Sequence, residues 1–248
     1  APAAAQTSAR LFTSDDALNM ASVGAALMSP DGRSVFYSRT ELNWKENRRD
    51  TKYYMVPADG GEAYEYLGKE GGASFDFSPD GKYFTFTRTV DTKSQIFWMR
   101  TTGGEAVQLT KHATSIGQYV WSADSTKIFF RSTNARPEAE QKAIDAKEDA
   151  IFVDEGPNGQ ERSYWTSLWV YDLATKSETR LTTDDQLISA FDPSPDGARI
   201  VFVSRRTNRR NDANVNEIYL LDVASKTTTR LTTNNAPEGG VNWAPDGS

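Results

Sequence analysis

The chain has 248 residues, of which 38% are hydrophobic and 25% are charged, and its net charge is -6 at pH 7. This acidic balance argues against generic nucleic-acid binding, and no apolar run approaches the roughly 20 residues that span a membrane. The chain has no cysteine and one histidine, which excludes disulfides, thiolate metal sites and histidine-rich metal centres. We therefore expect neither a metal nor a cofactor.

The first residues, "APAAAQ", are small and rich in Ala, like the residues around a signal-peptidase site. This composition favours an exported bacterial protein, periplasmic or secreted, whose signal peptide has been removed. An ordinary chain terminus is the alternative.

A turn motif recurs along the chain. Ser-Pro-Asp-Gly or a close variant begins at residues 29, 78, 122, 194 and 244, so successive copies are 49, 44, 72 and 50 residues apart. Pro presets φ at the second position, Asp tolerates unusual backbone angles and Gly adopts positive φ, so each copy predicts a hairpin between two strands.

A second motif alternates with the first. "PADGGEAYEYL", "RTTGGEAVQLT", "LATKSETRLTT" and "VASKTTTRLTT" each place a turn before a short strand. A period of about 40–50 residues that contains several strands is typical of a β-propeller with one blade per repeat. We predict an all-β propeller of four-stranded antiparallel blades, about four blades and a remnant. An ordinary β-sandwich and a closed four-bladed ring are the alternatives.

The repeats set the expected domain organisation. A lead-in covers residues 1–22 and a partial propeller covers 23–248, with repeats at about 23–67, 73–110, 117–183 and 188–233 and a remnant at 240–248. Because an unclosed stack exposes strand edges, we expect the chain to be part of a longer polypeptide.

The second repeat can be assigned strand by strand. We expect strands A to D at residues 73–77, 82–87, 94–100 and 106–110, in one antiparallel sheet with strand A nearest a central axis. Phe84 and Phe86 then share one face, and Tyr83 and Thr85 share the other.

The B–C loops and D–A connections differ between repeats, and scaffold turns repeat while functional loops diverge, so we expect the B–C face to meet a substrate or partner. The largest difference is an acidic insertion at residues 136–162. Pro137 suits a first helical position, and residues 138–149 are good helix formers, expected as a solvated flap. Residues 150–153 read as a strand that is followed directly by Asp154 and Glu155. These carboxylates could bind a cationic group such as a peptide amino terminus; a packed or solvent-facing turn is the alternative.

Catalytic motifs are not found in the sequence. It has no Gly-x-Ser-x-Gly nucleophile elbow, and residues 212–217 begin like a calcium loop but lack its Gly and its bidentate Glu. His112 falls in a connector and is expected to be a surface residue or a partner contact. We therefore assign no catalytic or metal-binding residue.

The opening stretch, "LFTSDDALNMASVGAALMSPDGRSVFYSRTELNWKENRRDTKYYMVPADGGEA", resembles the start of serine peptidases of the prolyl oligopeptidase superfamily. "KEDAIFVDEG" with the later "LWVYDLATKSETRLTT" is similar to the acylaminoacyl-peptidase and bacterial dipeptidyl-peptidase branch. The resemblance implies a short helix at residues 13–20. It also implies a seven- or eight-bladed propeller that caps an α/β-hydrolase domain carrying the Ser-Asp-His triad.

The implied partners are therefore the hydrolase domain of the same polypeptide and oligopeptide substrates, with neither nucleic acid nor a membrane. In this family the propeller filters substrates by size, and in the dipeptidyl branch it helps to hold the free amino terminus. Only Asp154 and Glu155 can take that second role here, and the helical Glu-Glu motif of the better-known dipeptidyl peptidases is not in this sequence.

We therefore predict a non-catalytic propeller segment that gates access to an exported serine exopeptidase. Two other functions are considered. The first is a Tol-type or stand-alone propeller that binds proteins or peptides. The second is a propeller lyase or glycosidase, for which the A strands offer few acids beyond Asp76 and Asp192.

Overall fold

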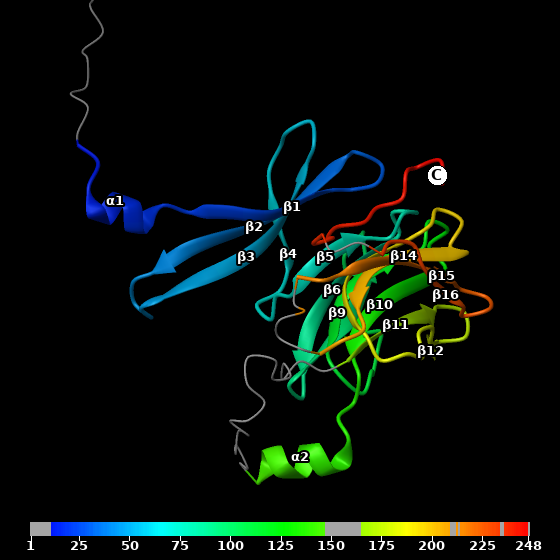
Figure 1. Cartoon of the computed structure of the whole chain (residues 1–248). Helices are drawn as coiled ribbons and strands as arrows, with labels where there is room; N and C mark the ends of the chain where they lie inside the picture. Colours follow the sequence, from blue (N-terminus) through cyan, green and yellow to red (C-terminus); the bar gives the residue numbers. More distant parts are fainter. Residues whose placement is uncertain (1–10, 147–164, 209–211, 213, 234–235, 248) are drawn as a thin grey trace, which may run out of the picture. The chain divides into compact units, whose positions relative to one another are not determined.

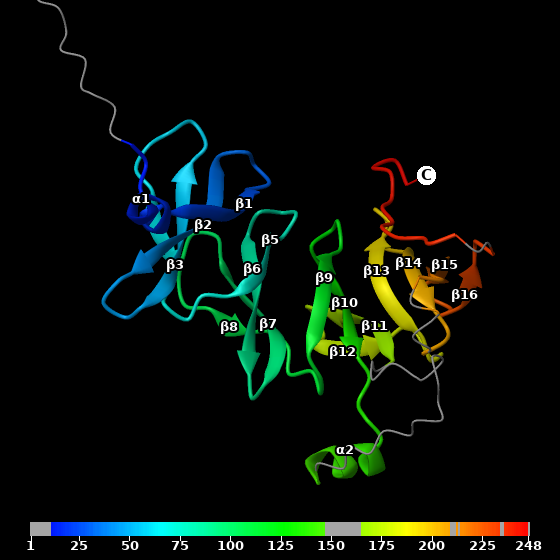
Figure 2. The same ribbon diagram turned by 60° about the vertical axis from the view of Figure 1, so that its left-hand side comes forward.

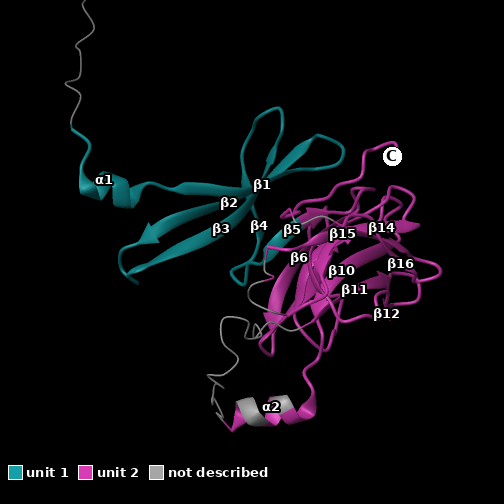
Figure 3. Cartoon of the chain, viewed as in Figure 1, with its two compact units in different colours: residues 1–75 teal, residues 76–248 magenta. Residues whose placement is uncertain are grey.

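The computed structural model describes residues 11–146, 165–208, 212, 214–233 and 236–247 (Figure 1). In this described part the chain is all-β, with four antiparallel four-stranded sheets and two short helices. The chain divides into two compact units, residues 1–75 and 76–248 (Figure 3).

The first unit contains the sheet of the first repeat, in the order β1-β2-β3-β4. Its elements are α1 (Ser14–Asn19), β1 (Ser22–Met28), β2 (Ser34–Asn43), β3 (Arg48–Pro57) and β4 (Tyr64–Leu67). Phe36 is fully buried among the rings of Tyr53, Tyr66 and Phe75.

Helix α1 confirms the short helix expected at residues 13–20. Thr13 caps it, because its hydroxyl accepts the amide of Asp16 while the carboxylate of Asp16 accepts the amide of Thr13. The indole of Trp44 donates to the side chain of Asn19 at 2.7 Å, which ties the end of the helix to the β2–β3 hairpin.

The second unit contains three further sheets, which Figure 2 shows side by side in chain order. Strand β5 begins just before the boundary between the units. Each sheet is a simple meander. The strands are β5 (Ala73–Phe77), β6 (Tyr83–Val90), β7 (Lys93–Arg100), β8 (Val107–Gln108), β9 (Ile116–Trp121), β10 (Lys127–Thr133), β11 (Thr166–Asp172), β12 (Ser177–Arg180), β13 (Leu187–Pro193), β14 (Arg199–Arg205), β15 (Glu217–Asp222) and β16 (Thr228–Arg230). Helix α2 (Glu138–Asp145) lies between β10 and β11.

The second repeat forms the single antiparallel sheet that the sequence predicts, β5-β6-β7-β8. Strand β5 matches the expected range, whereas β8 has two residues in place of five. The faces also agree: the rings of Phe84 and Phe86 lie 6.1 Å apart, and the hydroxyl of Thr85 accepts hydrogen bonds from Tyr119 and Trp121 of the third repeat.

The recurrent turn has the same hydrogen bonds in all four complete repeats. In the second repeat, the Ser78 hydroxyl donates to Asp80 Oδ1 at 2.7 Å and accepts the amide of Tyr83 at 2.9 Å. The carboxylate of Asp80 also accepts the amide of Lys82. Gly81 has φ of +69°, which favours glycine, and Ser125 adopts +58° in the third copy. The bond from Ser78 is the main reason that the pKa of Asp80 falls to about 2.

A threonine after strand D has a second repeated role. The hydroxyls of Thr110, Thr182 and Thr232 accept the amides of Ile96, Leu168 and Ile218 at 3.0, 3.0 and 2.8 Å. These bonds continue the pairing of strands C and D beyond the short β8, β12 and β16. The first repeat has Gly68 at the corresponding position.

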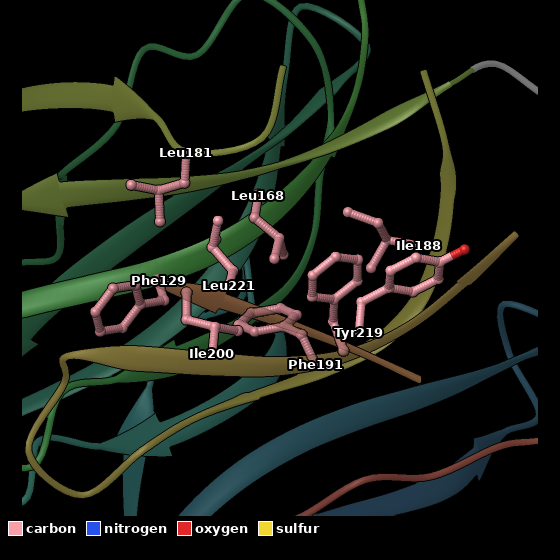
Figure 4. Packing of buried hydrophobic residues seen from close by; sticks show 9 residues of the cluster. Phe129, Leu168, Leu181, Ile188, Phe191, Ile200, Tyr219 and Leu221 are labelled. Atoms are coloured by element: carbon pink, nitrogen blue, oxygen red, sulfur yellow. The ribbon is translucent and has the colours of Figure 1, made fainter. Parts of the chain in front are cut away.

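Apolar side chains from neighbouring sheets form the core of the second unit. Figure 4 shows the cluster between the third and fourth repeats, where Phe129 and Leu168 lie near Ile200 and Phe191. A matching cluster between the second and third repeats contains Ile96, Ile116, Tyr119, Trp121, Ile128, Phe130 and Tyr171. Full burial of one such side chain contributes about 1.5–3 kcal/mol, so packing between neighbouring blades stabilises the unit.

The fifth turn motif is attached to the fourth repeat. The backbone amide of Trp243 donates to the carboxylate of Asp192 at 2.8 Å, and its indole donates to the Asp192 carbonyl at 3.0 Å. Arg199 lies over the Trp243 ring at 4.7 Å. Trp121, at the same place in the third repeat, donates its indole to Thr85 of the preceding blade. The remnant therefore packs on the preceding repeat as the third one does.

Candidate functional site

The antiparallel order of strands gives every sheet of the second unit two distinct ends. The turn end contains the Ser-x-Asp-x turns, and the connector end contains the B–C loops and the D–A connections. Asp91 and Thr92, both at positive φ, form the loop between β6 and β7. The corresponding segment of the third repeat runs from 134 to 165, and that of the fourth from 206 to 216. These differences all occur at the connector end.

Asp154 and Glu155 lie outside the described residues, as does the strand expected at 150–153. Their proposed role at the connector end therefore stays a prediction. Helix α2 begins at the expected residue, Glu138, and ends at Asp145, four residues earlier than predicted. Its described side chains are exposed, and Lys142 pairs with Glu138 along the helix.

His112 corrects an expectation from the sequence. The sequence predicts a surface residue or a partner contact, but only 7% of His112 is exposed, so it is not a surface residue. Its Nδ1 lies 2.7 Å from a carboxylate oxygen of Glu178 on β12, and its Nε2 lies 2.8 Å from the hydroxyl of Ser132 on β10. Its ring packs edge-on against Phe130 and Trp169. The connector that follows the second repeat is thus fixed by side chains of the third repeat.

Ser132, His112 and Glu178 stand in the order hydroxyl, imidazole, carboxylate, which is also the order of a serine-hydrolase triad. Ser132 lies within strand β10 and is 2% exposed, so a substrate carbonyl cannot approach its oxygen. The arrangement therefore has a structural role: its hydrogen bonds join the second blade to the third. No local pattern in the sequence indicates this arrangement, because the three residues are up to 66 positions apart.

Gln95 fixes the same connector from the other side. It is 3% exposed. Its oxygen accepts the Thr110 hydroxyl and the His112 amide, at 3.0 and 2.8 Å. Its amide nitrogen donates to the carbonyls of His112 and Thr114, at 3.1 and 3.3 Å. All four bonds of one buried amide are used, so this connector has one well-defined conformation.

The two acids of the A strands have local partners. Asp76 accepts the amide of Phe77, and burial raises the pKa of its carboxyl to about 6. Asp192 accepts the amide of Trp243. Each carboxylate is thus engaged by backbone, an arrangement that gives no support to an acid pair for glycoside or lyase chemistry.

Among the residues that the structure describes, no group of three or more His, Cys, Asp or Glu side chains could hold a metal ion. Among the described helices, none is long and apolar enough to cross a membrane.

Comparison with known proteins finds sequence similarity to two peptidases. No protein-family model matches it. It is 24% identical over 210 residues to YuxL, an uncharacterised peptidase of Bacillus subtilis (strain 168), across 80% of this chain and 32% of YuxL. It is 25% identical over 121 residues to dipeptidyl-peptidase 5 of Porphyromonas endodontalis, across 48% of this chain and 18% of that protein. The chain thus spans about a third or less of these curated relatives.

Solved structures share the fold. The acylaminoacyl peptidase of Pyrococcus horikoshii superposes with a TM-score of 0.58 at 18% identity, over 87% of this chain and 33% of that one. TolB from Acinetobacter baumannii gives a TM-score of 0.55 at 19% identity, over 91% of this chain and 47% of that one. The four sheets and these likenesses define a β-propeller.

Both curated relatives are named as peptidases, and their matches agree with the resemblance of the opening stretch and the third repeat. The chain is thus similar to the propeller portion of peptidases of the prolyl oligopeptidase type.

Proposed function

We propose that this chain is the non-catalytic propeller segment of an exported serine exopeptidase of the dipeptidyl- or acylaminoacyl-peptidase type. In this proposal it gates the access of oligopeptides to an α/β-hydrolase domain of the same polypeptide. The observation that carries the proposal is the similarity to peptidase YuxL over 80% of the chain. The contrast between a repeated turn end and a variable connector end supports it, because the variable end is suited to face a substrate.

The catalytic part of the proposal is tested on the purified chain. We expect no cleavage of aminoacyl or dipeptidyl chromogenic substrates, and no labelling by a serine-reactive phosphonate. The described hydroxyl–imidazole pair, Ser132 and His112, is buried and cannot serve as a nucleophile and base. Labelling that disappears in Ser132→Ala would overturn this part.

The role of the acidic insertion requires the full-length enzyme. The double variant Asp154→Asn and Glu155→Gln keeps size and hydrogen bonding but removes charge. If the pair anchors a free amine, kcat/KM for free-amine peptides falls by about 1–3 kcal/mol, and N-blocked peptides are unaffected. Equal loss for both classes of peptide would instead show a structural pair.

A binding module of the Tol type is the second candidate, favoured by the likeness to TolB. The coding sequence after Ser248 distinguishes the two. Further repeats followed by a Gly-x-Ser-x-Gly motif support the peptidase, and a stop codon soon after ring closure supports the binding module. Cell fractionation of the bacterial source, with detection of the processed amino terminus, tests export.

A further inference from the structure

Arg131 differs from its counterparts in the other repeats. It stands nine residues after Ser122, the first residue of its turn motif. The residues nine positions after the corresponding turn residues are Ser38, Thr87 and Val203. Each of these is small, so the blade itself does not need a long or charged side chain at this position.

The A strand of the third repeat makes room for the arginine. Gly117 lies opposite, and a Cβ added there would come within 3.1 Å of Arg131 Nη2. The first repeat pairs the same two positions, because a Cβ at Gly24 would lie 3.4 Å from the hydroxyl of Ser38. A glycine thus faces this position in both repeats. In the first repeat it faces the small Ser38, and in the third it leaves space for the guanidinium of Arg131.

Nη1 of the Arg131 guanidinium has a hydrogen-bond partner, whereas Nε has none. Nη1 donates to the carbonyl of Ile188 on β13 at 2.7 Å. Nε is buried and has no hydrogen-bond partner, and no carboxylate in the described part of the chain forms an ion pair with Arg131. Nε–H and one N–H of Nη2 point in the same direction, which is the edge that binds a carboxylate through two parallel bonds.

This arrangement is unfavourable for folding alone. Burial lowers the pKa of Arg131, since the surrounding strands disfavour its charge. A partly desolvated charge without an anionic partner costs free energy, and positions that keep such a cost are typically functional. Arg131 is therefore hard to explain as part of the scaffold.

Its place in the blade agrees with a binding role. Arg131 lies near the end of β10, and Gly117 lies near the start of β9, so both are at the connector end of the third blade. The long B–C segment of this repeat begins three residues after Arg131.

We propose that Arg131 is a recognition residue for a carboxylate on the peptide that the connector end receives. Nη2 would bind the carboxylate first, and Nε–H, which is buried in the free chain, would complete the side-on pair after a small movement of the neighbouring side chains, while the Ile188 carbonyl holds the guanidinium in place. The carboxylate comes either from an acidic side chain or from the free carboxyl terminus of the peptide. The choice of a peptide as ligand rests on the proposed function.

The test uses three N-acetylated tetrapeptides and the purified chain. The first is Ala-Ala-Glu-Ala with an amidated carboxyl terminus, the second replaces Glu by Gln, and the third is the Gln peptide with a free carboxyl terminus. Binding is followed by NMR on the Nε–H of Arg131 and the amide of Gly117. We expect the Glu peptide, the free-acid peptide or both to shift these resonances, with at least about tenfold tighter binding than the amidated Gln peptide.

Three variants separate binding from folding. Arg131→Met should lose this preference while the melting temperature stays the same or rises, because a desolvated charge is removed. Arg131→Lys keeps the charge but loses the paired N–H edge, and should bind with intermediate affinity. Lys127→Met, at the turn end of the same strand, makes the same charge change and should leave binding unaltered.

Several results would overturn the inference. They are equal binding of charged and uncharged peptides, no binding at all, or a lower melting temperature for Arg131→Met with peptide binding unchanged. Binding that appears only in Asp154→Asn/Glu155→Gln would assign Arg131 to the chain's own insertion instead. If Arg131→Met does not fold, the wild-type Nε–H shifts and Arg131→Lys decide. None of these results depends on a hydrolase domain, so failure here is distinguishable from failure of the proposed function.

Discussion

The two ends of the blades satisfy their polar groups in different ways. At the turn end, Ser78, Ser122 and Ser194 each donate to the carboxylate two residues later and accept the amide five residues later. At the connector end, the position before the first core residue of strand C is Gln95, Ser167 or Glu217. All three are at least 96% buried, yet each has different partners.

The partners at the connector end come from other parts of the chain. Gln95 holds the connector through His112, Ser167 is bonded to Asn134 and Arg180, and Glu217 is bonded to Arg230 and Thr232. At the turn end, the same hydrogen bonds therefore satisfy the same backbone groups in every blade. At the connector end, the buried polar groups have different partners in each blade, so the sequence there is free to vary with function.

The largest effect is expected from Gln95→Leu. The change leaves buried partners of four hydrogen bonds unpaired, at a cost of about 3 kcal/mol in the free energy of unfolding. Urea denaturation measures it. The control is Gln108→Leu in the same blade, which loses one bond to the Thr110 carbonyl at a more exposed site and should cost less than about 1 kcal/mol. Equal costs would mean that the connector is not fixed by Gln95.

Asp76→Asn tests how a buried carboxyl on strand β5 affects the pH dependence of stability, for comparison with a carboxylate in the turn. The folded chain keeps a proton on Asp76 up to about pH 6, whereas its ordinary pKa is 3.8. Its contribution to stability is therefore largest below pH 3.8 and is lost as the pH rises through about 6. Relative to the wild type, the Asn variant should gain about 1–3 kcal/mol between pH 4 and pH 8.

Asp80→Asn is the matched control with the opposite sign. Its pKa is lowered to about 2, chiefly by the Ser78 hydroxyl. The stability that its charge contributes is present above pH 3.8 and is lost as the pH falls through about 2. The Asn variant should therefore be less stable than the wild type at pH 6 and converge with it at pH 2. Parallel pH profiles for the two variants would contradict both assignments.

Ser122→Ala tests the repeated turn itself. It removes one donor to Asp124 and one acceptor for the Lys127 amide, so we expect a loss of about 1–2 kcal/mol. The same change at Ser194 should cost a similar amount, since its bonds are the same. Thermal denaturation of the two variants compares the copies, and a difference above about 1 kcal/mol would show that the turns are not equivalent.

The same difference between the ends explains what could be predicted from the sequence. The turn motif encodes its own geometry within six residues, so the hairpins, the meander of the second repeat and strand β5 followed from local chemistry. His112 was wrongly expected at the surface, because its partners Ser132 and Glu178 are 20 and 66 residues away. Arg131 is visible in the sequence only once the repeats are aligned, where it replaces a small residue. Asp154 and Glu155 stay predictions.

The smallest effect on stability is expected at helix α2. Lys142 and Glu138 form an ion pair at 2.7 Å, but their side chains are 74% and 82% exposed. Such a pair is screened by water and contributes at most a few tenths of a kcal/mol within the helix. Lys142→Ala should therefore change the global free energy of unfolding by less than about 0.5 kcal/mol in urea denaturation. Alanine also keeps helix propensity high, so the comparison isolates the ion pair. If the connector end is free to vary, the blade should not depend on this helix. A loss above about 1 kcal/mol would show instead that α2 packs on the sheets, and that the longest connector belongs to the scaffold.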